Sequence, residues 1–174
     1  VETGILEMNT SGNVCGTLSV NGRDAAFGAT GISSAYEDGT ISFASVNWSS
    51  GEFIFDIIPN IGSGDVINAV VVDGVENSGT IIVADGASDL KMTFNLSAED
   101  LQQFLFDEGL ESYESTIMTW ETSSNLGDYL DDIQILSDNG VNVDLSILGN
   151  SLVATFTVPE PHETAALIGA IALF

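Results

Sequence analysis

Apolar and polar residues alternate along several stretches of the chain, which is the period-two pattern of strands that bury one face. These alternating stretches are residues 14–20, 90–96, 141–147 and 151–158. Other runs are apolar at most positions, as is typical of central strands covered on both faces. Those runs are residues 53–58, 66–72 and 80–84. The body of the chain is therefore predicted to consist mainly of strands.

The apolar parity changes once inside a strand-like stretch. Ile41 and Phe43 occupy odd positions, whereas Val46 and Trp48 occupy even positions. An extra residue in a strand shifts the parity in this way, so the pattern predicts a β-bulge near Ala44 or Ser45.

Short turn signals separate the strand-like stretches. Asn-Gly and Asp-Gly pairs supply the positive φ that tight hairpins require. The signals are Asn21-Gly22, Asp38-Gly39, Ser50-Gly51, Asp73-Gly74, Asp85-Gly86, Asn139-Gly140 and Gly149-Asn150. Their spacing has no fixed repeat, so the sequence does not predict a solenoid. Many short strands joined by such turns predict a mainly β fold, an antiparallel β-sandwich or jelly-roll-like domain.

One short helix is predicted near residues 97–108. Ser97 is a residue type that caps helix N-termini well, and Gly109 provides a stop. Leu101 and Leu105 lie four residues apart and would share one apolar face.

The charge of the chain restricts its partners. The sequence has 26 acidic and 2 basic residues and a formal net charge of −24. Nucleic acid is excluded as a partner, because neutralising phosphates requires clustered Lys and Arg. Such a chain repels itself unless cations screen it, so we expect a salty or cation-rich setting. Hydrophobic residues make up 44% of the sequence, which favours an ordered domain over a disordered acidic chain.

Candidate catalytic groups are scarce. His162 is the only histidine and Cys15 the only cysteine, so neither a His-dependent triad in the body nor a structural zinc site is predicted. We therefore expect no enzyme activity. A pair of carboxylates across a sugar cleft, as in glycoside hydrolases, remains a third hypothesis. Trp48 and Trp120 are either sugar-stacking residues or parts of the core.

Calcium is the cofactor for which the sequence offers ligands, because Ca²⁺ prefers carboxylate and carbonyl oxygens. The densest group of candidate ligands is Asp128, Asp131, Asp132 and Asp138, beside a predicted helical turn at residues 125–132. The alternative interpretation is a solvated acidic loop, since no EF-hand spacing is present.

The C-terminal segment differs in character from the body. Val158-Pro159-Glu160-Pro161 is followed at Ala165 by ten residues without a polar side chain. Proline cannot continue a central strand, so this joint divides a body at residues 1–157 from a tail at residues 158–174. The segment resembles the C-terminal sorting signal of PEP-CTERM proteins. The resemblance implies export in bacteria, transient inner-membrane anchoring, and processing near the Pro-Glu-Pro by an exosortase-type enzyme.

The tail departs from the sorting-signal pattern in its length and its lack of basic residues. As a helix its ten apolar residues would rise about 15 Å, against a hydrocarbon core about 30 Å thick. A retained tail would be buried in a neighbouring subunit, which predicts a homopolymer. The residues expected to make this contact are Ala165, Ala166, Leu167, Ile168, Gly169, Ala170, Ile171, Leu173 and Phe174.

The leading hypothesis from the sequence is an exported, noncatalytic structural protein of the bacterial cell surface or extracellular matrix. Such a protein would assemble into a filament or sheet through its apolar tail or its strand edges. The alternative is a Ca-dependent carbohydrate-binding or adhesion module, with a polysaccharide as partner.

Overall fold

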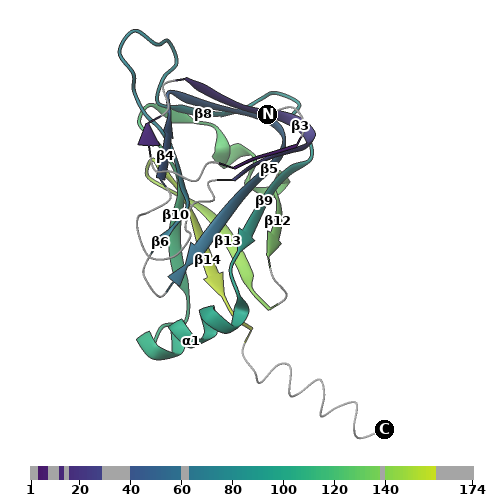
Figure 1. Ribbon diagram of the computed structural model, residues 1–174, viewed down its shortest axis with the longest axis vertical. Coiled ribbons are helices and arrows are strands. Elements are labelled where there is room, and N and C mark those ends of the chain that lie inside the picture. The colour runs from purple at the N-terminus through teal and green to yellow at the C-terminus, as the bar shows by residue number, and fades with distance from the viewer. Residues whose placement is uncertain are drawn as a thin grey trace, which may run out of the picture.

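The computed structural model describes residues 4–7, 12–13, 16–28, 40–59, 63–137 and 140–159. The fold is mainly β, with two sheets facing each other and one α-helix at one end of the molecule (Figure 1). This sandwich-like arrangement confirms the expected fold class. No helix within the described ranges is long and apolar enough to cross a membrane.

The two sheets are unequal in size. The eight-stranded sheet contains β1 (Gly4–Glu7), β3 (Thr17–Gly28), β5 (Ser45–Ile58), β6 (Ser63–Gly64), β8 (Thr80–Val83), β9 (Leu90–Asn95), β11 (Ser123–Ser124) and β12 (Gln134–Ser137). The six-stranded sheet contains β2 (Gly12–Asn13), β4 (Thr40–Phe43), β7 (Val66–Ala69), β10 (Tyr113–Trp120), β13 (Asn142–Leu148) and β14 (Ser151–Thr157). The helical elements are α1 (Ala98–Glu108) and the 3₁₀ turns η2 (Leu126–Asp128) and η3 (Leu130–Asp132).

Strand direction is where the expectation was wrong. Of the twelve strand pairs formed by the described residues, nine are parallel and three antiparallel. Asp73-Gly74 leads from β7 in one sheet to β8 in the other, and Asp85-Gly86 joins β8 to β9, which both pair with β5. Gly149-Asn150 does close an antiparallel hairpin, between β13 and β14. Three of the predicted turns are therefore present, and only the last joins strands that pair with each other. The prediction was wrong for Asn21-Gly22 and Ser50-Gly51, which lie inside the long strands β3 and β5. Asp38-Gly39 and Asn139 lie outside the described residues.

The chain runs repeatedly from the six-stranded sheet to the eight-stranded sheet, and each such run, called a pass here, stacks on the one before it. Each pass gives one strand to the six-stranded sheet and then crosses to the other sheet, as in β4 to β5, β7 to β8 and β9, and β10 to β11 and β12. The stacking is solenoid-like, although the sequence shows no fixed repeat. The reason is that α1 and loops of unequal length are inserted into individual passes, which hides any period.

Parallel register aligns the core residues of successive passes. Phe27 pairs with Phe53, Phe53 with Met92, and Met92 with Ile135. The first three of these side chains are fully buried. Phe53 also lies edge-on to Trp48, with ring centroids 4.9 Å apart. A continuous apolar ladder therefore runs through the centre of the fold.

The parity change at Ala44 marks a corner rather than a bulge within one strand. Ala44 separates β4 from β5, and these two strands belong to different sheets. Its backbone N–H donates to the carbonyl of Gly16 at 2.8 Å, and its carbonyl accepts from the N–H of Gly79 at 2.6 Å. These hydrogen bonds hold the chain where it crosses from one sheet to the other. Because the sheets face each other, the residues that point into the core change from odd positions in β4 to even positions at the start of β5.

The predicted helix is confirmed. The hydroxyl of Ser97 accepts a hydrogen bond from the N–H of Asp100 at 3.4 Å, and Gly109 ends the helix with φ +66°. Leu101 and Leu105 are buried, so α1 packs its apolar face on the end of the sandwich (Figure 1). The second helical stretch expected at 125–132 is present as the two 3₁₀ turns η2 and η3.

Candidate functional site

A gap in the six-stranded sheet forms the candidate site. β10 pairs with β7 only from Met118 to Trp120, opposite Ile67 to Ala69. Its pairing with β14 shifts register between Thr116 and Met118, which leaves Ile117 in a bulge. Further along, β6 pairs with β5 of the other sheet instead of with β10. The strands on the two sides of the gap therefore separate as they approach α1.

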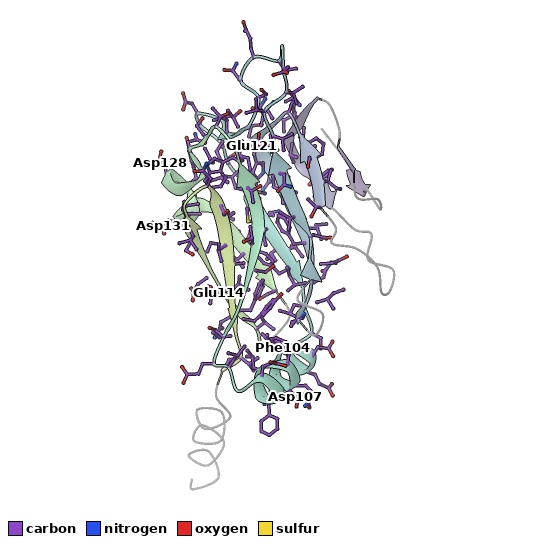
Figure 2. All side chains as sticks on the ribbon, turned by 90° about the vertical axis from the view of Figure 1, so that its left-hand side faces the viewer. Phe104, Asp107, Glu114, Glu121, Asp128 and Asp131 are labelled. Atoms are coloured by element: carbon purple, nitrogen blue, oxygen red, sulfur yellow. The ribbon has the colours of Figure 1, made fainter. Side chains whose placement is uncertain are left out.

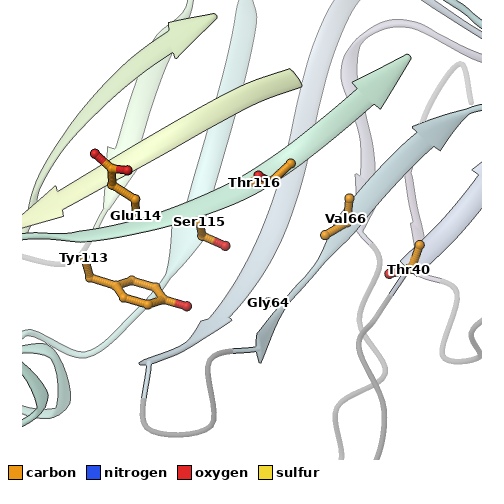
Figure 3. Close-up of a pocket in the computed structure, with 7 residues that line it drawn as sticks. All are labelled: Thr40, Gly64, Val66, Tyr113, Glu114, Ser115 and Thr116. Carbon is orange, nitrogen blue, oxygen red and sulfur yellow. The ribbon is translucent and has the colours of Figure 1, made fainter. Parts of the chain in front are cut away.

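The gap opens as a polar groove of about 320 Å³ (Figure 3). Its described lining residues are Thr40, Gly64, Val66, Tyr113, Glu114, Ser115 and Thr116. Tyr113 and Ser115 project from one side of β10 toward Gly64, whereas Glu114 projects from the opposite side (Figure 3). Hydroxyl groups thus dominate the chemistry of the groove.

The Tyr113 side chain is held in place by aromatic packing. Its ring lies edge-on to Phe104 of α1, with centroids 5.4 Å apart, and is stacked with Phe156 of β14 at 6.2 Å. Burial raises the pKa of the Tyr113 hydroxyl, and a hydrogen bond with Ser115 opposes part of that rise. The hydroxyl is therefore protonated at neutral pH and can both donate and accept a hydrogen bond.

Glycine at position 64 keeps the groove open. A Cβ atom there would lie 3.1 Å from the Ser115 hydroxyl oxygen and 3.2 Å from Cδ1 of Ile57. Both contacts are tighter than ordinary van der Waals distances. Any side chain at this position would push against the wall that carries Ser115.

A buried carboxylate, Asp65, lies between two lining residues of the groove. Its N–H donates to the carbonyl of Asp56 at 2.9 Å, and its Oδ2 accepts from the N–H of Asp56 at 2.8 Å. Asp65 is fully buried, and its Oδ1 has no hydrogen-bond partner within the described part of the chain. Burial raises the pKa of Asp65 from 3.8 to about 7, with a smaller contribution from the charge of Asp56.

Sequence reasoning missed Asp65, although a signal was present. Asp65, Ile67 and Ala69 share the same parity, and the latter two face the core. A carboxylate at an inward position of a strand is unusual because burial disfavours its charged form. Tyr113 was missed because its role depends on the bulge in β10.

The predicted calcium ligands do not form a site among the described residues. Asp128 lies in η2, whereas Asp131 and Asp132 lie in η3, and all three are exposed (Figure 2 labels the first two). No group of three or more His, Cys, Asp or Glu side chains within the described ranges can hold a metal ion. Asp138, the fourth predicted ligand, lies outside those ranges.

Both tryptophans belong to the core rather than to a sugar platform. Trp48 is fully buried and Trp120 is 7% exposed, and the Trp48 indole N–H donates to the carbonyl of Gly51 at 3.3 Å. Glu114 is the one carboxylate among the described residues that line the groove. The groove therefore does not present the pair of facing carboxylates that glycoside hydrolysis uses.

The sorting-like motif lies at the boundary of the described chain. Val158 packs against the core directly after β14, and Pro159 is exposed. Glu160, Pro161, the tail at 165–174, Cys15 and His162 lie outside the described residues, so the division into body and tail stays a prediction.

Comparison with known proteins does not assign the chain to a family. No protein-family model, curated protein or solved structure matches it significantly.

Proposed function

We propose that this protein is an exported, noncatalytic structural protein of the bacterial cell surface or matrix, and that its copies assemble through sheet edges. Export rests on the resemblance of Val158-Pro159-Glu160-Pro161 and the apolar tail to sorting signals. Assembly rests on the parallel ladder, which is the single observation that carries the proposal.

The ladder that supports assembly runs without interruption through β1, β3, β5, β9 and β12, and all of its pairs are parallel. In the described part of the chain, β1 pairs with β3 alone and β12 with β9 alone. Each outer strand therefore has one edge without a strand partner. An open edge of this kind is a template for a strand from another chain.

Both open edges belong to the same ladder and run in the same direction. If β12 of one copy added to β1 of the next, the parallel ladder would continue from copy to copy. Such a head-to-tail contact uses two different surfaces and does not close on itself unless the rotation between copies allows it. The expected product is a filament.

The edge strand β12 is short, but its side chains do not block such pairing. Natural edge strands are commonly blocked by charged residues, especially Lys, or by Pro. The β12 sequence, Gln134-Ile135-Leu136-Ser137, contains neither. Repulsion must then come from the rest of the surface, which carries most of the net charge of −24.

Assembly is therefore expected to depend on salt. Repulsion between like-charged copies extends about 30 Å at about 0.01 M salt but only about 3 Å at about 1 M. Sedimentation velocity across this range should show monomers at low salt and growing species at high salt. Monomers at every salt concentration, with the complete chain, would refute the proposal.

A matched pair of variants tests the edge itself. Leu136 of β12 is 37% exposed and Leu110, which follows α1, is 50% exposed. Leu136→Asp places a charge on the open edge and should abolish the salt-driven species. Leu110→Asp adds the same charge away from the edge and should leave assembly unchanged. Equal effects of the two substitutions would mean that repulsion, not edge pairing, controls association.

A further inference from the structure

The groove between β10 and the β6–β7 segment has no role in edge pairing. β4, β7 and β10 are internal strands of the six-stranded sheet, whereas β1 and β12 are outer strands of the other ladder. We propose that this groove binds an uncharged saccharide, with the hydroxyl groups of Tyr113 and Ser115 as its principal hydrogen-bonding partners.

The polarity of the groove points to a ligand rich in hydroxyl groups. Tyr113, Ser115, Thr40 and Thr116 each bring a hydroxyl to the lining. A hydroxyl group both donates and accepts hydrogen bonds. Such a lining can therefore pair with the hydroxyl groups of a sugar ring, which do the same. Val66 adds an apolar contact beside them, which suits the C–H face of a sugar.

The main chain adds further hydrogen-bonding groups. No ladder joins β10 to β6 or β7 before Met118 within the described residues. The backbone of β10 that faces the gap from Tyr113 to Thr116 therefore has no strand partner on that side. Backbone groups at such a position are fixed in space and can orient a ligand without an entropy cost of their own.

The charged residues around the groove disfavour an anionic ligand. The two basic residues of the protein are Arg23, which is paired with Asp89 at 3.6 Å, and Lys91 of β9. Neither lines the groove, whereas Glu114 does. An acidic sugar would thus meet a carboxylate and a strongly negative protein without a compensating cation.

The size of the groove fits a short stretch of saccharide. About 320 Å³ lies at the lower end of the range for small-molecule sites, which is about 300–1,000 Å³. The groove is partly open to solvent, so a saccharide bound in it would not be fully enclosed. This partial opening suits a short segment of a longer saccharide chain better than an enclosed small cofactor.

The test is an NMR titration of the complete, isotope-labelled protein at low salt, where assembly is suppressed. The probes are neutral trisaccharides of glucose in α- and β-linkage, of mannose and of galactose, and trigalacturonic acid as the anionic probe. We expect at least one neutral probe to shift the amide signals of Gly64, Val66 and residues 113–116, and trigalacturonic acid to shift none of them.

Variants connect the binding to the groove. Tyr113→Phe keeps the ring packing and Ser115→Ala keeps the strand, and each should weaken binding about threefold to tenfold through loss of one hydrogen bond. Gly64→Ala should abolish the shifts by narrowing the groove. Gly127→Ala is the control, because a Cβ there meets only Ile147, at an ordinary 3.6 Å.

Several results would overturn the inference. They are the absence of groove shifts with every neutral probe, shifts confined to other surfaces, equal binding of trigalacturonic acid, or unchanged affinity in both hydroxyl variants. If Gly64→Ala fails to fold, Tyr113→Phe and Ser115→Ala decide the question. Sedimentation of the same samples at high salt reports on assembly separately, so failure of one proposal is distinguishable from failure of the other.

Discussion

Replacing Asp65 with asparagine is expected to raise the free energy of unfolding by up to about 4 kcal/mol above neutral pH. Below neutral pH, the substitution should remove most of the pH dependence of that free energy. Asp65 is fully buried, and its Oδ1 has no partner among the described residues. Its ionised form is therefore poorly solvated in the fold. An amide is neutral at every pH and can still accept the hydrogen bond from the N–H of Asp56 through its oxygen.

The direction of the pH effect follows from the raised pKa of Asp65, which is about 7 in the fold against an ordinary value of 3.8. The folded state prefers the protonated acid, so this group contributes its full stability below about pH 4. That contribution is lost as the pH rises through about 7, because the fold must then hold a buried charge. Each pKa unit corresponds to about 1.36 kcal/mol, which gives the upper limit of about 4 kcal/mol.

Urea unfolding at several pH values between about 5 and about 8, at constant ionic strength, measures this effect. The free energy of unfolding of the wild-type protein should fall over this range, whereas that of Asp65→Asn should change much less. Asp128→Asn removes the same charge from an exposed position in η2 and should follow the wild type. Parallel pH profiles for Asp65→Asn and the wild type would show that the buried carboxylate is not the source.

Truncating Phe53 to alanine is expected to cost about 3–5 kcal/mol, the usual range for a large buried aromatic residue. Phe53 is fully buried and its ring lies 4.9 Å from Trp48, 6.1 Å from Phe27 and 6.4 Å from Phe55. The substitution removes the central member of the apolar ladder, and the ladder hydrogen bonds on both sides of β5 limit how far the cavity can collapse.

Phe106→Ala is the matched control for the core substitution. Phe106 lies on α1 and is 81% exposed, so its truncation should change the free energy of unfolding by about 0.5 kcal/mol or less. Chemical unfolding of both variants gives the comparison. Similar losses in the two variants would contradict the assignment of Phe53 to a continuous core.

The local elements of this fold are readable in the sequence, but the pairing of its strands is not. Ser97, Leu101 and Gly109 locate α1 because capping and helical periodicity act within a few residues. Asp73-Gly74 locates a turn equally well, yet it does not specify which strand β8 will pair with. Parallel pairing joins strands that are a whole pass of the chain apart. A regular repeat in the sequence would show which strands pair, but the insertion of α1 makes the passes unequal in length.

The candidate site was only partly predictable for a related reason. In β10, the inward-facing residues are at odd positions up to Ile117 and at even positions from Met118. Two adjacent apolar residues at this point are a sign of a bulge that can be read from the sequence. That this bulge opens a groove depends on β6 pairing with the opposite sheet. Asp65 stands out by parity alone, but its raised pKa depends on burial that no local pattern reports.

Fibre diffraction from oriented, salt-grown assemblies tests most directly whether copies join through the edges of β1 and β12. If β12 of one copy continues the ladder into β1 of the next, strands lie across the filament axis. We then expect a meridional reflection at about 4.7–4.9 Å, the spacing of hydrogen-bonded strands. Filaments without that meridional reflection, or no filaments at any salt concentration, would contradict assembly through the sheet edges.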